Sequence, residues 1–199
     1  MFSKYDVYTT VQSLYCYPDS DVLKNKLNIR DRNELKQAEE EITALKQYML
    51  MESPIKGRFS KTQLMNIHRF LFEDIYPFAG LVHREQISKG DTMFYPPHLI
   101  GQELDKVFAK LHDKMLQNTD RKRQIDHLSY IMSELNIIHP FREGNGRSIR
   151  ELIRCMALHY GFTLNWSRVD WDTMLDAAVK SVVDSMGFCD VIIRCVVEG

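Results

Sequence analysis

The sequence has no apolar run long enough to span a lipid bilayer, and its first residues, MFSKYDVYTT, lack the hydrophobic core of a signal peptide. An excess of charge of one sign is also missing, because 26 Lys and Arg residues are balanced by 27 Asp and Glu residues. No strong basic field is therefore present to attract nucleic acid or an anionic membrane. These absences predict a cytoplasmic protein with no direct nucleic-acid or membrane partner.

Internal repeats, low-complexity segments and paired cysteine motifs are absent as well. The four cysteines are scattered along the chain without a CxxC spacing, which predicts reduced, structural thiols. They are Cys16, Cys155, Cys189 and Cys195. A chain of 199 residues suits one domain with a sizeable core.

What the sequence does contain is the stretch HPFREGNGRSIR, residues 139–150. A proline follows His139 and ends the preceding helical pattern, so that the imidazole lies at the mouth of a loop. Phe141 supplies an apolar anchor for this loop. Glu143 offers a hard carboxylate oxygen of the kind that Mg²⁺ prefers. The first half of the stretch therefore predicts a general base beside a metal ligand.

The second half of the stretch predicts a phosphate site. Gly144, Asn145 and Gly146 allow backbone N–H groups to turn inward as an anion nest, and the Asn amide adds a donor. A helix is expected to follow, which places the nest at a helix N-terminus. Arg147 and Arg150 lie on one side of its first turn and are suited to phosphate oxygens. The apolar spacing that predicts this helix is that of Ile149, Leu152, Ile153 and Met156.

Each of these pieces alone is more typical of a surface turn, a helix end or a solvated face than of a site. Together, residues 139–147 match every position of HxFx(D/E)GN(G/K)R, the signature of the Fic (filamentation induced by cAMP) proteins, and Arg150 extends it to the longer GRxxR form. The stretches YPDSDVLKNK and EEITAL also resemble the N-terminal part of Fic proteins of the toxin and secreted-effector type. The resemblance runs from about residue 17 to about residue 183.

The resemblance implies a mainly α fold, the Fic-type helical bundle with one short β-hairpin. Helical periodicity independently indicates mostly helix. We expect a single Fic domain over residues 1–199. Its parts are an N-terminal arm and helix in residues 1–50, the Fic core in residues 51–165 and a C-terminal helical extension in residues 166–199.

The first expected helix is capped by Asp31 or Asn33. Its charged residues are expected to form the solvated face of an amphipathic helix. The residues expected to form its apolar face are Leu35, Ala38, Ile42, Leu45 and Met49.

A second helix is expected to open at Ser60 or Thr62 and to stop at Tyr76. Its His68 is interpreted as a packed or surface residue, because a histidine on a helix is more often structural than catalytic. The charged residues 117–124 are interpreted as an exposed connection.

The segment ISKGDTMF has the pattern of a short hairpin turning at its Gly-Asp pair. By itself it predicts an ordinary surface hairpin. The resemblance implies that it is the flap of Fic proteins, which docks a segment of the target protein by β-strand addition next to the catalytic histidine. The residues assigned to this role are Ile87, Ser88, Lys89, Gly90, Asp91, Thr92, Met93 and Phe94.

The reaction that the resemblance implies is AMPylation, the transfer of AMP from ATP to a hydroxyl of a target protein with release of pyrophosphate. His139 would take the proton of that hydroxyl. Glu143 would hold Mg²⁺, which offsets developing charge. Arg147 and Arg150 would hold the β/γ end of ATP. The full phosphate-binding set is Arg142, Gly144, Asn145, Gly146, Arg147 and Arg150.

Two other functions remain as alternatives. The related death-on-curing kinases carry Lys where Gly146 stands and are thought to transfer the γ-phosphate, so Gly146 favours adenylyl transfer. A non-catalytic module that binds nucleotide or a partner is the second alternative, and the intact His139, Glu143 and Arg147 argue against it. Relatives that use other nucleotides or a CDP-linked donor, or that remove AMP, are not separated by the loop alone.

Many Fic proteins are silenced by a helix with the pattern (S/T)xxxE(G/N), whose Glu pairs with the residue that corresponds to Arg150. No Glu in this sequence has Ser or Thr four residues earlier, although Glu198-Gly199 fits the tail of the pattern. We therefore expect a small antitoxin that supplies this helix, and a protein that is the toxin of the pair. The expected targets are bacterial type II topoisomerases, DNA gyrase or topoisomerase IV, because no delivery domain follows Gly199. Delivery into a host cell is the alternative.

Overall fold

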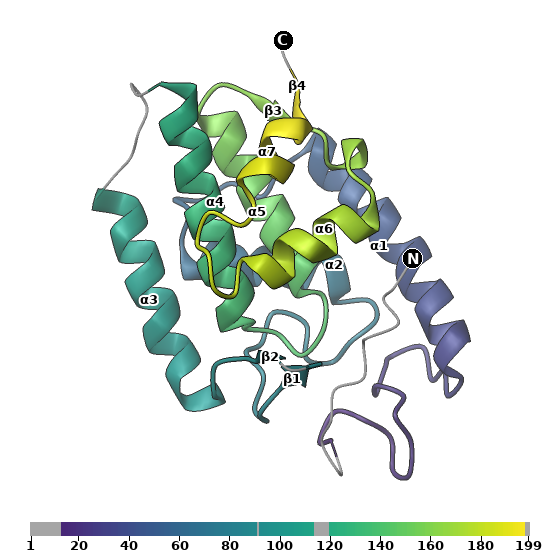
Figure 1. Ribbon diagram of the computed structural model, residues 1–199. Helices are drawn as coiled ribbons and strands as arrows, with labels where there is room; N and C mark the ends of the chain where they lie inside the picture. The colour runs from purple at the N-terminus through teal and green to yellow at the C-terminus, as the bar shows by residue number, and fades with distance from the viewer. Residues whose placement is uncertain (1–12, 91, 114–119, 198–199) are drawn as a thin grey trace.

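The computed structural model describes residues 13–90, 92–113 and 120–197 and is mainly helical, as the sequence predicts (Figure 1). The helices are α1 (Arg32–Glu52), α2 (Lys61–Phe72), α3 (Pro97–Asp113), α4 (Arg121–Ile138), α5 (Asn145–His159), the short 3₁₀ helix η1 (Trp166–Arg168), α6 (Trp171–Lys180) and α7 (Cys189–Cys195). The strands are β1 (Ser88–Lys89), β2 (Thr92–Met93), β3 (Thr163–Leu164) and β4 (Val196–Val197).

Helix α5 lies at the centre of the bundle, between α2 and α4. Helix α3 packs on α4, α1 packs on α2, and α7 covers another part of α4 (Figure 1). The predicted apolar stripe of α5 is confirmed, because its four members are buried: Ile149, Leu152, Ile153 and Met156. Residues 139–144, the first part of the predicted site, connect α4 to the central helix α5.

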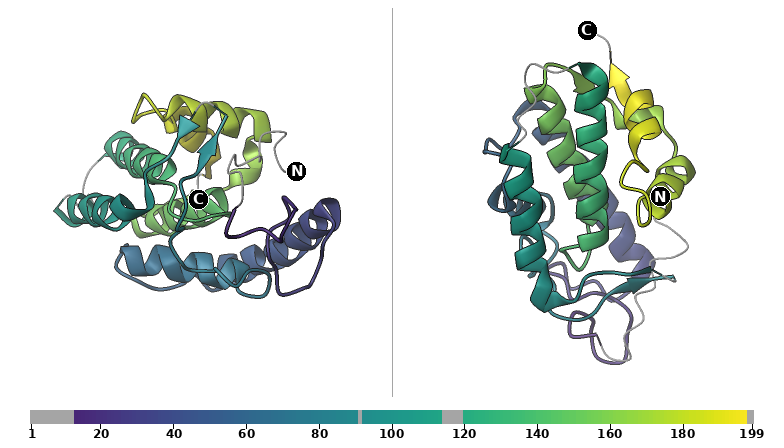
Figure 2. Two further views of the ribbon diagram at one scale, coloured as in Figure 1. Left: turned by 90° about the horizontal axis from the view of Figure 1, so that it is seen from below. Right: turned by 60° about the vertical axis from the view of Figure 1, so that its left-hand side comes forward.

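The two strand pairs are short and antiparallel. Strands β1 and β2 form the expected hairpin, which lies across one end of the helices (Figure 2). Strand β3 pairs with β4, so that Thr163 faces Val197 and Leu164 faces Val196. This second pair was not expected from the sequence. It attaches the end of the described chain to the segment that follows α5.

Helix α1 begins at the expected cap but presents a different face. Asp31 is the N-cap, as predicted. The predicted apolar stripe is wrong in its second half, since Leu45 is 62% exposed and Met49 is 46% exposed. The buried residues are instead Leu35, Glu39, Thr43 and Leu50. Helix α1 is thus rotated so that a carboxylate and a hydroxyl, with partners beneath them, replace part of the apolar stripe.

The Asp31 cap should stabilise α1 measurably. Its carboxylate Oδ1 accepts hydrogen bonds from the backbone N–H groups of Asn33 and Glu34, both at 2.9 Å. Replacing Asp31 by Ala leaves these donors without their acceptor, and we expect the free energy of unfolding to fall by about 1 kcal/mol. Chemical denaturation of Asp31→Ala against the wild type measures this, with Asp21→Ala as the control for loss of a nearby surface charge.

Two boundaries differ from the sequence-based expectation. Residues 121–124, interpreted as a connection, form the first turn of α4, capped by Asp120, whose Oδ1 accepts from the Arg123 N–H at 3.0 Å. Gln124 is buried, and the three basic residues before it are exposed. Residues 117–119 lie outside the described ranges. Helix α2 starts at the expected Ser60 cap but ends at Phe72, four residues before Tyr76.

All four cysteines are free thiols, as predicted. None of the helices in the described ranges is both long and apolar enough to cross a lipid bilayer.

Candidate active site

His139 occupies the end of α4 with its side chain enclosed. Its backbone is left-handed, with φ of 51°, and its N–H closes the helix on Leu135 O at 3.0 Å. The imidazole is 8% exposed and stacks on the ring of Phe94, with ring centroids 3.7 Å apart. The ring atom Nδ1 lies 3.3 Å from Asn136 O. Because a carbonyl can only accept, Nδ1 carries the proton, and the lone pair is on Nε2.

Burial sets the protonation state of this histidine. Desolvation lowers the pKa of His139 from its ordinary 6.5 to about 3, and the hydrogen bond to Asn136 opposes this shift only in part. The imidazole is therefore neutral at pH 7. Geometry and pKa together leave Nε2 able to accept a proton, as a general base requires.

The lowered pKa predicts the pH dependence of the reaction. The neutral form of His139 is the active one, and with a pKa of about 3 it stays neutral throughout pH 5.5–8. We expect kcat/KM to change by less than about twofold between pH 7.5 and 5.5, whereas a histidine with an ordinary pKa would lose about tenfold. Initial rates across this window measure the effect, and circular dichroism at each pH verifies that the fold persists. A tenfold fall with the protein still folded would contradict the assignment.

His68 supports the loop from below. Its ring stacks on that of Phe141, with centroids 3.8 Å apart, and is completely buried. Nδ1 accepts from the Gly80 N–H at 2.7 Å, so Nε2 carries the proton and donates to Glu143 O at 2.9 Å. Burial lowers the pKa of His68 to about 3, which keeps it neutral. Of the two interpretations, packed or surface, the structure shows His68 to be packed, and its contacts add that it fixes the backbone of Glu143.

Asn145 closes the loop on itself. Its Oδ1 accepts from the Phe141 N–H at 2.9 Å, and its Nδ2 donates to Phe141 O at 2.6 Å. The sequence-based expectation gave this side chain to phosphate, and the structure differs by engaging it with the loop backbone. A clasp across four residues needs both an acceptor and a donor, and the Asn amide supplies both.

The turn that follows has the geometry of an anion nest. Gly144 is the N-cap of α5, with φ of 80°, and a Cβ at this position would overlap the ring of Phe72. The first amides of α5 have no acceptor within the helix, and the helix dipole adds positive potential there. Gly146, in that first turn, is exposed. The turn therefore has the left-handed glycine and the helix start that the sequence predicted.

Glu143 lies beside this nest with its carboxylate at the loop mouth. Its Oε1 accepts from the Gly144 N–H at 2.9 Å and lies 3.7 Å from Nη2 of Arg147. Within the described ranges, no group of three or more His, Cys, Asp or Glu side chains converges on one point. A single partly exposed carboxylate fits Mg²⁺, which usually takes one or two protein ligands and keeps water and phosphate oxygens as the others.

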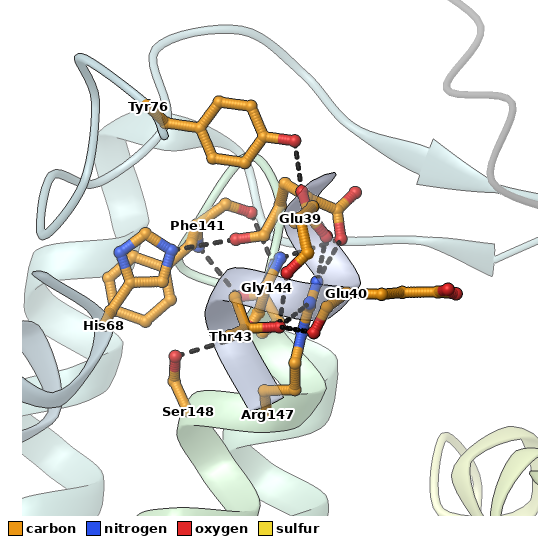
Figure 3. Close-up of polar contacts among 11 residues, drawn as sticks. Glu39, Glu40, Thr43, His68, Tyr76, Phe141, Gly144, Arg147 and Ser148 are labelled. Atoms are coloured by element: carbon orange, nitrogen blue, oxygen red, sulfur yellow. Dashed lines mark hydrogen bonds and ion pairs between the residues drawn. The ribbon is translucent and has the colours of Figure 1, made fainter. Parts of the chain in front are cut away.

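The three arginines of the loop and the helix have different surroundings. Arg142 is buried, and its Nε lies 3.3 Å from Oε1 of Glu85, so the structure pairs it with a carboxylate and not with the nest. Arg147 is also engaged, because its Nη2 forms an ion pair with Glu39 and its Nη1 donates to Thr43 Oγ1 at 3.0 Å (Figure 3). Both arrangements differ from the expected phosphate role.

Arg150 is the exception. Among residues 13–90, 92–113 and 120–197 it has no hydrogen bond and no ion pair, and its Nη1 lies against the face of Gly146. Burial, and then the charge of Arg147, lower the pKa of Arg150 to about 10, which leaves it charged at pH 7. Arg150 therefore retains its capacity to bind an anion at the first turn of α5.

Sequence reasoning missed the residues that hold Arg147. Glu39 and Thr43 belong to α1, about a hundred residues earlier in the chain, and Tyr76 donates its hydroxyl proton to the second carboxylate oxygen of Glu39. The available signal was the four-residue spacing of Leu35, Glu39 and Thr43. The prediction instead favoured the more apolar residues one position earlier, Ala38 and Ile42.

The hairpin beside His139 is exposed only between its ends. Ser88 pairs with Met93 and Lys89 with Thr92, and Met93 is 71% exposed. Asp91 lies outside the described residues. The first and last members of the predicted docking element, Ile87 and Phe94, are buried, and the Phe94 N–H donates to Ile87 O at 3.2 Å. These two residues anchor the hairpin, and Gly90 and Met93 between them are exposed.

The amino-acid sequence is similar to those of known proteins. A model of the Fic/DOC family matches residues 58–157, which contain α2, the β1–β2 hairpin, α3, α4 and most of α5, the helix that follows the loop. The chain is 31% identical over 176 residues to the probable protein adenylyltransferase y4lH of Sinorhizobium fredii, covering 87% of this chain and 90% of that protein. It is 30% identical over 181 residues to the protein adenylyltransferase VbhT of Bartonella schoenbuchensis, covering 90% of this chain but only 38% of that relative.

The fold is also similar to that of a solved structure. The N-terminal Fic domain of a VirB-translocated Bep effector protein from Bartonella quintana, crystallised with bound ADP, superimposes with a TM-score of 0.85. The two chains are 24% identical, and the match covers 92% of this chain and 94% of the other.

Proposed function

The chain belongs to the Fic/DOC family, and we propose that it is a protein adenylyltransferase that moves AMP from ATP to a hydroxyl side chain of a target protein. The observation that carries this proposal is the neutral, buried His139 with its Nε2 lone pair, on the same clasped loop as an anion nest. Relatives that cover most of the chain have names that describe the same activity.

The proposed reaction needs one proton transfer and one displacement at phosphorus. Nε2 of His139 accepts the proton of the target hydroxyl, whose oxygen forms a bond to the α-phosphorus as the bond to the pyrophosphate oxygen breaks. The amides of the nest are already oriented before the reaction and stabilise the negative charge on the phosphate oxygens. Mg²⁺, when bound at Glu143, would offset the negative charge of the triphosphate.

Arg150 is the side chain best placed to hold the far phosphates in this proposal. It is charged, lies at the first turn of α5 and has no partner within the described ranges. Gly146 presents no side chain between this guanidinium and the nest. Phosphate therefore meets backbone N–H groups and one arginine at the same helix end.

The proposed partners follow from the hairpin and from the missing inhibitory pattern. Residues 88–93 would pair with an extended segment of the target by β-strand addition, which holds a backbone without requiring one sequence. We retain DNA gyrase or topoisomerase IV as candidate targets in a bacterial cytoplasm, with a small antitoxin that supplies the inhibitory helix. Action inside a host cell is the alternative setting.

The position of the transferred phosphorus tests the proposed function. The chain is incubated with bacterial lysate and Mg²⁺ in parallel reactions that contain ATP labelled at either the α- or the γ-phosphate. The same reactions are run with His139→Ala, and only label that is lost with this variant is counted. We expect such label on protein from the α position only. Label from the γ position only would identify a kinase of the death-on-curing type instead.

A further inference from the structure

The carboxylate of Glu39 is an unusual member of the site, because it lies in α1, far from the motif in sequence. It is 3% exposed. One oxygen pairs with Nη2 of Arg147, and the other accepts from the hydroxyl of Tyr76 (Figure 3). One helical turn further along α1, Thr43 accepts from Nη1 of the same guanidinium. Three side chains outside the motif therefore determine where one motif arginine points.

The same guanidinium nitrogen lies near a second carboxylate. Nη2 of Arg147 is 3.7 Å from Oε1 of Glu143 and closer to Oε1 of Glu39. Arg147 thus lies between the residue proposed to hold Mg²⁺ and a buried carboxylate from α1. An arginine that moved onto Glu143 would compete with a divalent cation for the same oxygen.

The charges of this group favour a cation at Glu143. Burial would lower the pKa of Arg147, but Glu39 and then Glu143 outweigh it and raise that pKa, so the guanidinium stays charged. Burial, and then Glu39, raise the pKa of Tyr76, which stays neutral and donates. Two carboxylates and one guanidinium leave one net negative charge. Neutralising Glu39 would leave none, in surroundings where charges interact more strongly than in water.

We propose that Glu39 is a positioning residue that draws Arg147 toward itself, weakens its ion pair with Glu143 and so keeps the Glu143 carboxylate available to the Mg²⁺ of the nucleotide. This inference rests on the proposed function, since it concerns the metal that accompanies ATP. The competing account is that Glu39 only attaches α1 to the bundle, in which case its loss would change stability without changing the response to Mg²⁺.

The test is a Mg²⁺ titration of nucleotide binding, which does not depend on catalysis. Binding of the ATP analogue AMPPNP is measured by calorimetry at increasing Mg²⁺ concentration, without target protein, so that no target hydroxyl can attack its α-phosphorus. In Glu39→Gln, which keeps the shape but not the charge, we expect the Mg²⁺ concentration at half-maximal binding to rise about tenfold. Glu41→Gln, an exposed position on the same helix, is the matched control and should leave it unchanged.

Further variants separate competition from general damage. If Arg147 is the competing cation, Glu39→Gln made in Arg147→Met should shift the midpoint by less than about twofold relative to Arg147→Met alone. Tyr76→Phe keeps every charge but releases one oxygen of Glu39, and a shift of about two- to threefold in the same direction is expected. Thermal melts of all variants identify any that fail to fold. If Glu39→Gln fails to fold, the Mg²⁺ midpoint of Tyr76→Phe tests the inference in its place.

Each other outcome has a definite meaning. An unchanged Mg²⁺ midpoint in folded Glu39→Gln, or in Tyr76→Phe if that variant decides, would overturn the inference. If Glu39→Gln shifts the midpoint as far in Arg147→Met as it does in the wild type, the inference is also overturned, because Arg147 would then not be the competitor. If the wild type itself shows no Mg²⁺-dependent binding of AMPPNP, the proposed function fails, and that result is distinct from the other two.

Discussion

Replacing His139 by Ala is expected to lower the rate of AMP transfer by about 10²- to 10⁴-fold, because a positioned general base contributes this much. Nucleotide binding should change little. The Gly144 N–H donates to the carboxylate of Glu143, and the guanidinium of Arg150 lies against Gly146, so these contacts do not involve the imidazole. The substitution should therefore act on kcat with little effect on the dissociation constant of the nucleotide.

The measurement compares single-turnover labelling of the target with AMPPNP binding for the same protein samples. His98→Ala, an exposed histidine on α3, controls for the loss of an imidazole elsewhere and should retain full activity. Retention of more than about a tenth of the wild-type rate by His139→Ala would exclude this histidine as the base. Loss of nucleotide binding together with activity would indicate that the ring instead supports the loop.

Replacing Gly144 by Ala is expected to have the second large effect. Its φ of 80° is costly for any residue with a Cβ, and that Cβ would overlap the ring of Phe72. Strain and overpacking together should destabilise the fold by about 2–4 kcal/mol. If the loop moves to avoid the overlap, a displacement of about 1 Å would lower activity by about 10²-fold.

Two glycines elsewhere separate the two causes. Gly161 also has a positive φ but has open space around it, so Gly161→Ala should show the cost of strain alone. Gly101 lies within α3 and is also open, so Gly101→Ala should be neutral or slightly stabilising. Removing part of the obstructing ring in Phe72→Leu/Gly144→Ala should recover some activity over Gly144→Ala. No recovery would mean that contact with Phe72 is not what excludes a side chain.

The loop and the helix after it could be predicted because their signals are local. Pro140 limits where α4 can end, the glycines permit the turn, and the apolar spacing of α5 places its N-terminus at the nest. These features depend on backbone conformations that particular residues favour or forbid. The helix end, the left-handed residues and the buried face of α5 therefore follow from residues a few positions apart.

The partners of the motif arginines could not be predicted in the same way. Arg147 points to Glu39 because α1 packs across α2 with its polar stripe inward, and this rotation is decided by contacts between residues far apart in sequence. A pattern that weighs only hydrophobicity favours Leu45 and Met49, which are exposed. Likewise, the engagement of Arg142 with Glu85 depends on how the segment before the hairpin lies against the loop.

The hairpin could be predicted from the sequence only in part. The hairpin was predicted from a Gly-Asp pair, and the pairing of Ser88 with Met93 confirms that it forms. The burial of Ile87 and Phe94 depends on the bundle end against which they pack, and the stacking of Phe94 on His139 is a tertiary contact. Local sequence thus predicts that the hairpin forms, while packing decides which of its residues remain accessible to a target.

The most direct test of the central claim is the mass of the modified target. The protein that acquires label is purified from reactions with the wild type and with His139→Ala, and its mass and modified residue are determined by mass spectrometry. The account predicts the addition of one AMP group to a serine, threonine or tyrosine, present with the wild type and absent with the variant. Addition of a phosphate alone, or an AMP group that appears equally with His139→Ala, would contradict it.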